Sequence, residues 1–288
     1  MVHVSTPLPS DPHLPLSPGS PADPAREGVE VGVHRWMRGE STDTVDRVAQ
    51  ELPIELSYHG VPHVVMLATP ADLTDFAYGF TVSEELVVSA EEIRAVEVVP
   101  GEESVQVRVS IAWERFPELL RRRRNLTGRT GCGLCGAETL EQAVRGHPEL
   151  TSELQVSSTE LHAMIVALES RQPLNARTGS VHAAAWIEPG RGIQLVREDV
   201  GRHNALDKTI GALLRAQVDL RAGYMLVTSR ASYEMVQKTA AVGIGMLVAL
   251  SAPTSFAIRH AQRSGLTLVA FARRDKHVVY AHPRRLAD

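Results

Sequence analysis

Apolar and polar positions alternate along much of the first half of the chain, a pattern typical of half-buried β-strands. The alternating stretches are residues 29–33, 52–56, 61–67, 95–99 and 104–111. The His59-Gly60 pair predicts a hairpin turn between the second and third of them. One helix is expected between the strands, with Thr69 as its N-cap and Pro70 in its first position. Its apolar face is Leu73, Phe76, Ala77 and Phe80. Together these elements predict a small α+β unit that ends near Trp113.

The second half changes to a regular alternation of helices and strands. Ser157 and Glu160 form a capping box, which predicts a helix with an apolar face at Leu161, Met164, Ile165 and Leu168. A hairpin of strands 181–187 and 193–196 follows. Then come helix 204–215, strand 224–228, helix 232–242, strand 246–250, helix 254–264 and strand 266–271. This order predicts an α/β layered sheet, mostly parallel with one antiparallel pair.

Two segments interrupt these units. Seven prolines lie between Pro7 and Pro24, among Ser, Asp and Gly, and this composition predicts a disordered tail. Arg121 to Arg124, followed by four glycines between Asn125 and Gly136, predict a linker. The expected organisation is therefore a tail (1–28), an N-terminal α+β subdomain (29–120), a basic Gly-rich loop (121–156) and an α/β domain (157–288).

Composition narrows the class of protein. The chain has 288 residues, 43% of them hydrophobic, and 30 Lys and Arg against 34 Asp and Glu, for a net charge of −4. A strongly basic field is absent, so we do not expect nucleic-acid binding. The longest mostly apolar run, residues 240–250, is shorter than the roughly 18 residues of a membrane helix. No secretory signal precedes the fold, and two cysteines form no disulfide framework, so we expect a cytoplasmic protein.

The two cysteines stand three positions apart, as Cys132 and Cys135, in a glycine-rich stretch. Such a pair can form a disulfide, supply half of a metal site, or provide one activated nucleophile with a helper. Inert buried thiols are disfavoured, because the neighbours are glycines, Arg129 and Thr130. A zinc site would need histidines to complete it, and the pair at suitable spacing, His59 and His63, lies far upstream.

The interpretation that fits this setting best is a thiolate on a mobile loop. Arg121 to Arg124 and Arg129 would lower the pKa of such a thiol. A thioredoxin-like site is a poorer fit, since it expects the pair between a strand and a helix N-terminus. A mobile thiolate can visit two places, as a carrier of a chemical group requires.

Three loops in the second half are suited to bind anions. Each follows a strand of the predicted sheet and leads into a helix, so they should lie together at one edge. Helix N-termini backed by Ser, Thr or Arg favour phosphates, although Ser and Thr are also ordinary caps. The candidate residues are Gly201, Arg202, His203, Ser229, Arg230, Ser251 and Thr254, with Arg273 after the last strand. Arg197, Glu198 and Asp199 are expected to belong in part to a structural ion network.

His182 raises a further comparison. A first helix followed by a hairpin and helix–strand repeats is the order of the zinc nucleoside deaminases, which carry His-x-Glu and a downstream Cys pair. Ala184 occupies the Glu position here, and both cysteines lie upstream. The sequence therefore predicts a deaminase-like fold without its zinc or its general acid/base. His182 is interpreted as a structural histidine or a ligand contact.

Four segments together resemble the FdhD family, the formate dehydrogenase accessory sulfur carriers. They are Thr130 to Gly136, Arg197 to Lys208, Thr228 to Glu234 and Ser251 to Thr254. The resemblance runs in order from about residue 30 onward. It implies a cytosolic, usually dimeric protein, with a cytidine-deaminase-like three-layer α/β sandwich after a smaller α+β subdomain.

The resemblance also implies a reaction. The protein would take sulfur from a cysteine desulfurase as a persulfide on Cys132, helped by Cys135. It would pass this sulfur to the Mo-bis(molybdopterin guanine dinucleotide) cofactor (or its tungsten form) before insertion into formate dehydrogenase. GDP-like nucleotides would mimic this acceptor, and no zinc is expected. The family's cofactor segment falls on Phe271, Ala272, Arg273, Arg274, Asp275 and Lys276.

Two other classes of function remain as alternatives. A nucleotide hydrolase or deaminase would need a bound metal, which elemental analysis would detect. A non-catalytic chaperone for the molybdenum cofactor would bind the nucleotide but tolerate the loss of both thiols.

Overall fold

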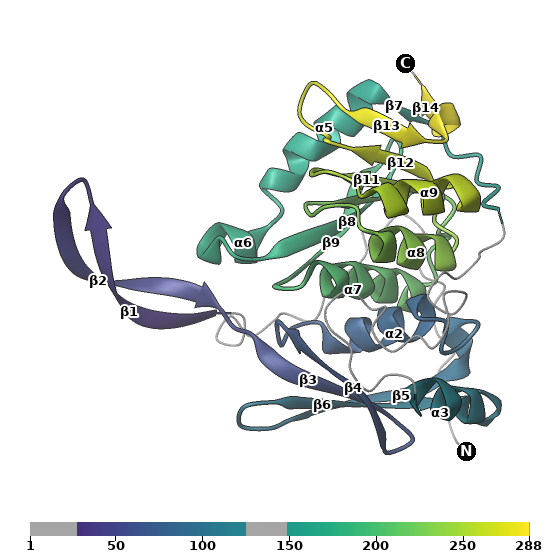
Figure 1. Cartoon of the computed structure of the whole chain (residues 1–288), viewed down its shortest axis with the longest axis horizontal. Coiled ribbons are helices and arrows are strands. Elements are labelled where there is room, and N and C mark those ends of the chain that lie inside the picture. Colours follow the sequence, from purple (N-terminus) through teal and green to yellow (C-terminus); the bar gives the residue numbers. More distant parts are fainter. Residues whose placement is uncertain (1–27, 125–148, 288) are drawn as a thin grey trace, which may run out of the picture.

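The structure is a computed structural model that describes residues 28–124 and 149–287. The predicted Pro-rich tail, apart from Gly28, and the loop with the two cysteines lie outside these residues. Within them, a four-stranded sheet and a six-stranded sheet lie on opposite sides of a layer of helices (Figure 1).

The N-terminal sheet has the strand order β4-β3-β6-β5. Its strands are β3 (Leu52–Tyr58), β4 (Val61–Ala68), β5 (Ile93–Pro100) and β6 (Val105–Ile111). The predicted hairpin between β3 and β4 is confirmed, and its turn residues His59 and Gly60 both have positive φ. Helix α2 (Leu73–Ser83) covers one face of the sheet, and Phe76 and Phe80 fill the core between them. The predicted α+β unit is present.

Helix α2 begins later than the sequence predicts. Its N-cap is Asp72, in the left-handed region with φ 52°, and Thr69 and Pro70 precede the helix. The prediction of Thr69 as the cap is wrong because its polar groups bind elsewhere. Its backbone N–H donates to Asp199 at 3.0 Å, and its hydroxyl accepts a hydrogen bond from the N–H of Val200.

The C-terminal sheet has the order β13-β12-β11-β10-β8-β9. Its strands are β8 (His182–Glu188), β9 (Gly192–Asp199), β10 (Tyr224–Val227), β11 (Met246–Ala249), β12 (Thr267–Ala270) and β13 (Val278–Ala281). The sheet is mixed, but the prediction of a single antiparallel pair is wrong, because three of its five strand pairs are antiparallel. Strand β10 pairs with β8 rather than β9, and the short strand β13 adds an edge that the sequence pattern did not indicate.

Helices cover both faces of this sheet. Helices α7 (Arg202–Arg215), α8 (Tyr233–Ala241) and α9 (Ser255–Ser264) pack on one face through one apolar core. Helix α5 (Ser158–Glu169) packs on the other through a second core, and α6 (Pro173–Thr178) follows it. The predicted capping box is half confirmed: the Glu160 N–H donates to the Ser157 hydroxyl at 3.1 Å, while the Glu160 carboxylate accepts from the Gly190 N–H instead.

The prediction that a linker starts at Arg121 is wrong. Arg121 to Arg124 form the end of helix α3 (Phe116–Arg124), so this basic run is helical before the described residues stop. The remaining short elements are the 3₁₀ turns η1 (Ala90–Glu92), η2 (Trp113–Arg115) and η3 (Pro283–Arg285), and the paired strands β7 (Val156–Ser157) and β14 (Leu286–Ala287).

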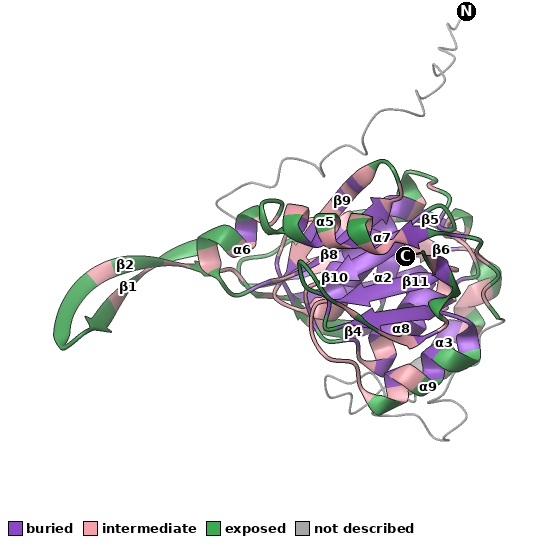
Figure 2. Ribbon diagram, turned by 90° about the horizontal axis from the view of Figure 1, so that it is seen from above, coloured by how far each residue is buried: buried purple, intermediate pink, exposed green. Residues whose placement is uncertain are grey.

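A long hairpin projects from the body of the molecule. It consists of β1 (Gly28–Met37) and β2 (Glu40–Ala49), which pair along their whole length (Figures 1 and 2). Most of its side chains are exposed, Trp36 at 69%. The sequence predicts only the start of β1, because β2 is rich in charged and hydroxyl residues and lacks an apolar alternation.

The two halves of the chain meet where α2 crosses α7. A Cβ atom on Gly79 of α2 would lie 1.7 Å from the carbonyl oxygen of Asp207. A Cβ on Gly211 of α7 would lie 1.8 Å from the carbonyl oxygen of Asp75. The backbones therefore approach so closely that glycine is the one residue that fits at either position.

Among residues 28–124 and 149–287, no helix combines the length and the apolar character that crossing a membrane requires.

Candidate functional site

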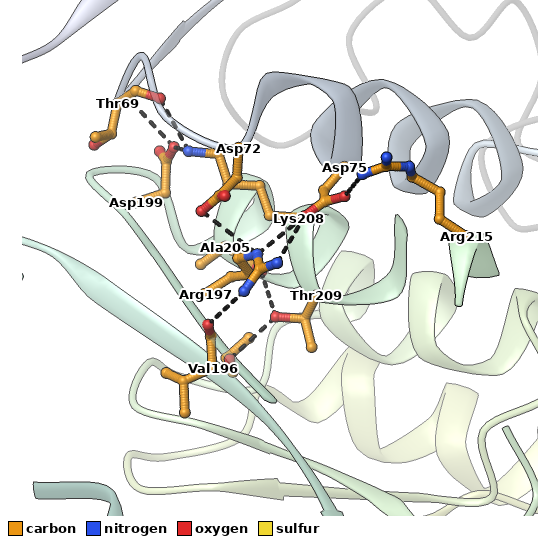
Figure 3. Close-up of polar contacts among 11 residues, drawn as sticks. Thr69, Asp72, Asp75, Val196, Arg197, Asp199, Ala205, Lys208, Thr209 and Arg215 are labelled. Atoms are coloured by element: carbon orange, nitrogen blue, oxygen red, sulfur yellow. Dashed lines mark hydrogen bonds and ion pairs between the residues drawn. The ribbon is translucent and has the colours of Figure 1, made fainter. Parts of the chain in front are cut away.

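Charged side chains are buried around the crossing of α2 and α7. The Asp75 carboxylate receives two hydrogen bonds from Arg197, at 2.9 and 3.0 Å, and also pairs with Arg215 (Figure 3). Asp72 lies 3.4 Å from the same Arg197 guanidinium. The Asp75 and Arg197 side chains are 4% and 7% exposed. Pairs this deeply buried contribute little net stability, but each charge becomes costly if its partner is removed.

A second set of contacts ties the strand end of β9 to the segment before α2. The ammonium group of Lys208 lies 2.6 Å from the Asp199 carboxylate and donates to the Thr69 carbonyl at 2.9 Å (Figure 3). Asn204 bridges the same carboxylate and the Leu67 carbonyl, at 2.9 Å each. The carboxyl end of β9 is thus held rigidly, and with it the start of α7.

These contacts confirm the predicted structural role of the Arg197-Glu198-Asp199 motif. Glu198 takes part as well, since its two carboxylate oxygens accept the backbone N–H groups of Leu174 and Asn175 at the start of α6. The sequence could not identify Asp75 as the partner of Arg197, because 122 positions separate them.

The predicted anion-binding loops lie together at one edge of the six-stranded sheet. Strands β9, β10, β11 and β12 run in the same direction, so their carboxyl ends share this edge. Backbone hydrogen bonds join neighbouring loops: Ala231 donates to Ala252, Thr254 to Ala231, and Phe271 to Ser251. The start of β8 completes the edge, because Ala183 and Thr228 exchange hydrogen bonds. The edge is a continuous, hydrogen-bonded surface.

The three helix N-termini at this edge differ in how they are capped. At α9, the Thr254 hydroxyl accepts the Ala257 N–H at 3.3 Å. At α7 the N-cap is Gly201, which has no side chain to offer, and the Ser232 hydroxyl at α8 makes no capping bond. Uncapped N-termini are the better anion sites, because their first N–H groups and the helix dipole both favour negative charge.

The candidate residues occupy these ends as follows. Gly201, Arg202 and His203 open α7; Ser229 and Arg230 follow β10; Ser251 and Thr254 follow β11. Arg230 is exposed, while Ser229 is buried and donates to the Arg230 carbonyl. All of them lie on the edge just described.

The segment from Phe271 to Lys276 continues the edge beyond β12. Phe271 has φ 49° and exposes 44% of its surface, while Ala272 is buried. Arg273 binds the carbonyl of Leu250 and so ties this segment to the loop after β11. Arg274 pairs with Glu169 of α5 at 2.8 Å, and Asp275 and Lys276 are exposed.

One cluster beside these loops was not predicted from the sequence. The ammonium group of Lys238 in α8 is 1% exposed and lies 2.9 Å from both the Asp207 and the Glu84 carboxylates. Ser83 completes its contacts at 3.1 Å. Burial lowers the pKa of Lys238, but the surrounding carboxylates, Glu234 among them, raise it above its usual value. The side chain is therefore charged.

Glu234 and His203 adjoin this cluster. Their nearest atoms are 3.3 Å apart, and both side chains are largely buried. Burial raises the pKa of Glu234 to about 7. Burial, with Arg202 and Lys238 nearby, lowers the pKa of His203 to about 3, so its imidazole is neutral. Burial and then Arg202 also lower the pKa of His182. Sequence reasoning missed Glu234, because an acidic residue in the first turn of a helix is common.

The predicted persulfide residues, Cys132 and Cys135, lie outside the described residues, so their roles stay predictions. Within the described ranges, no group of three or more His, Cys, Asp or Glu side chains is arranged to hold a metal ion.

Comparison with known proteins identifies the relatives of this chain. The sequence model of the FdhD/NarQ family matches residues 49–287. The chain belongs to the FdhD/NarQ family. A relative from Cupriavidus necator, named sulfur carrier protein FdhD, is 52% identical over 254 residues, covering 88% of each chain. A relative of the same name from Xanthomonas campestris pv. campestris is 50% identical over 269 residues, covering 93% of this chain and 96% of its own.

A solved structure shares the fold. A proposed formate dehydrogenase accessory protein from Desulfotalea psychrophila superposes with a TM-score of 0.71 at 24% identity, covering 90% of this chain and 99% of its own. The expected FdhD resemblance is confirmed. For the fold class, a mixed α/β architecture with more than one sheet is established, and its assignment as cytidine-deaminase-like stays a prediction.

Proposed function

We propose that this FdhD/NarQ protein is a sulfur carrier for formate dehydrogenase. It accepts sulfur from a cysteine desulfurase as a persulfide on Cys132 and delivers it to the Mo-bis(molybdopterin guanine dinucleotide) cofactor before that cofactor is inserted into the enzyme. The observation that carries the proposal is the 52% identity, across 88% of each chain, to a relative named sulfur carrier protein FdhD.

The loading step is a thiol–persulfide exchange. The Cys132 thiolate attacks the terminal sulfur of the desulfurase persulfide. A new S–S bond forms on Cys132, the old S–S bond breaks, and the desulfurase cysteine leaves as a thiolate. Only the thiolate is an effective nucleophile, so a basic setting that lowers the thiol pKa favours this step. Arg129 and the arginines that precede it supply that setting in the sequence.

The acceptor is the substrate of the delivery step, and its two guanine nucleotides bring two pyrophosphates. The uncapped N-termini of α7 and α8, with Arg202 and Arg230 beside them, support a phosphate site at this edge. Arginine–phosphate hydrogen bonds are charge-assisted and among the stronger ones in proteins. Phe271 to Lys276 extends the same edge, which supports a role for this segment in holding the acceptor.

Three finer expectations belong to the same proposal. The order of helices α5 and α6, the β8–β9 hairpin and three helix–strand repeats supports a deaminase-like domain. A homodimer and a cytoplasmic location follow from the family resemblance. Light scattering on the purified chain tests the dimer.

Intact-mass analysis after incubation with a cysteine desulfurase and cysteine tests the loading step. We expect the wild type to gain the mass of one sulfur atom, which reductant removes. Cys132→Ala should abolish the gain, and Cys135→Ala should reduce it less. If Cys132→Ala gained as much sulfur as the wild type, the nucleophile would be Cys135. If the wild type gained no sulfur, the proposal that the protein is a sulfur carrier would be refuted.

The variant that lacks both thiols separates the carrier from a cofactor chaperone. It should bind GDP normally, because the proposed nucleotide loops lie elsewhere in the chain, and fail to restore formate dehydrogenase activity in a strain without its own copy. Full restoration would show that holding the cofactor is sufficient.

A further inference from the structure

Three buried polar atoms around the N-termini of α7 and α8 have no hydrogen-bond partner among the described residues. They are Nε of Arg202, Nε2 of His203 and the hydroxyl oxygen of Ser232. Buried polar atoms are nearly always paired in folded proteins, so three such atoms in one place require an explanation. A bound anion would accept hydrogen bonds from Arg202 and Ser232 and from the uncapped first turns of both helices.

A carboxylate lies at the same place. Glu234 belongs to the first turn of α8, and its Oε2 lies 3.3 Å from Nε2 of His203 without forming a hydrogen bond with it. The side chain is 17% exposed. A carboxylate in this position opposes an incoming phosphate while it is ionised, because both groups carry negative charge and little water separates them.

Neighbouring charges do not neutralise Glu234. Facing it are Arg202, His203 and Asp207 from α7, Glu84 from the end of α2, and Lys238 from its own helix. His182 of β8 is also close enough to His203 to lower its pKa. Lys238 is already held by Asp207 and Glu84, and the imidazoles are neutral, so two cations face three carboxylates. A bound phosphate would add a fourth negative group and leave the cluster with a large excess of negative charge.

We propose that an anion bound at the N-termini of α7 and α8 is taken up together with one proton, which Glu234 holds. This inference rests on the proposed function, because the anion is the diphosphate of a guanine nucleotide. The proton comes from solvent, joins the Glu234 carboxylate as the anion binds, and returns to solvent when the anion leaves. Coupling between two ligands is reciprocal, so the anion raises proton affinity as much as the proton raises anion affinity.

The coupling predicts the direction and size of a pH effect. Glu234 is about half protonated near neutral pH, since its pKa is about 7. Above that pH the free protein carries an ionised Glu234 and the complex a protonated one. The affinity for GDP should therefore fall about tenfold for each unit of rising pH. Below neutral pH the dependence should level off.

Titration calorimetry of GDP at pH 7.5 and pH 8.5, in two buffers of different ionisation enthalpy, measures the proton directly. Between these pH values the phosphates of GDP are ionised and its guanine ring stays neutral, so any proton taken up belongs to the protein. We expect the wild type to take up close to one proton for each GDP. Glu234→Gln, which is always neutral, should bind GDP with no proton uptake and with the same affinity at both pH values.

Glu153→Gln, an exposed change before β7, is the matched control and should behave as the wild type. Wild-type binding without proton uptake would overturn this inference and leave the nucleotide site intact. Equal uptake by Glu234→Gln would overturn it too, by assigning the proton to another group. Absence of any GDP binding at millimolar concentration would instead refute the nucleotide site, and this inference with it. The wild-type result in the two buffers needs no variant, so the test survives if Glu234→Gln does not fold.

Discussion

Substituting Gly79 with alanine tests how closely α2 and α7 are packed. The added Cβ would lie 1.7 Å from the Asp207 carbonyl oxygen, and Cβ atoms essentially never approach closer than 3.0 Å. The helix must therefore retreat by about 1.3 Å. No side chain can rotate to relieve the contact, because the obstructing atoms belong to the backbone of α7.

The expected cost follows from two opposing effects. Overpacking of a well-packed interior costs about 1–3 kcal/mol, and a collision with backbone belongs at the upper end. Alanine recovers about 1 kcal/mol relative to glycine within a helix. Retreat also lengthens the Asp75–Arg197 contact. We expect a net loss of about 2 kcal/mol or more, which corresponds to a melting temperature about 4–8 °C lower.

Thermal unfolding followed by circular dichroism measures this loss. Gly32→Ala is the control, because a Cβ at Gly32 in β1 has no atom within 4 Å, and it should leave the melting temperature nearly unchanged. Gly211→Ala, which would meet the Asp75 carbonyl oxygen at 1.8 Å, should behave like Gly79→Ala. A melting temperature for Gly79→Ala equal to or above that of the wild type would refute the close crossing.

Three further results are expected. Asp75→Asn should lower the free energy of unfolding by about 3–5 kcal/mol in urea titrations, because Arg197 is left buried with a weaker partner, whereas the exposed Asp219→Asn should cost little; equal effects would contradict the buried network. The pKa of Glu234 is raised, so the stability that its protonated form provides below its ordinary pKa of 4.5 is lost as the pH rises through about 7. The melting temperature of Glu234→Gln relative to the wild type should therefore increase from pH 5 to pH 8. A constant difference would argue against a buried, titrating carboxylate. Replacing the hairpin β1–β2 by a short linker should leave the melting temperature of the body within a few degrees, because most of its side chains are exposed, and a large drop would show that the body depends on it.

The sequence predicts best those elements whose signals are local. The Ser157 cap and the glycine after α9, with φ 71° at Gly265, require no knowledge of the rest of the chain. Thr69 shows the limit of such reasoning. Threonine is a common N-cap, but this one binds a residue 130 positions away. Tertiary contacts determined its role, and no local pattern contains them.

The candidate site follows the same division. The positions of Arg202, Arg230 and Thr254 at one sheet edge were predictable, because helix–strand repeats place their loops together. The role of Glu234 was not predictable, because its raised pKa depends on burial and on the nearby carboxylates of Glu84 and Asp207, which come from other parts of the chain. Strand β2 was missed for a different reason. An exposed hairpin buries neither face, so its sequence does not need the alternating apolar positions by which a strand is predicted.

The crossing of α2 and α7 at Gly79 and Gly211 also limits how parts of this fold can be exchanged between related proteins. Cutting the chain between its two sheets would expose the backbone of α7 where α2 crosses it. It would also leave Asp75 and Arg197 on separate pieces. Neither sheet could be exchanged for a homologous one unless the incoming helix carried a glycine and a carboxylate at the matching turns. Two sheets that look separable in outline (Figure 1) therefore recombine as a single module.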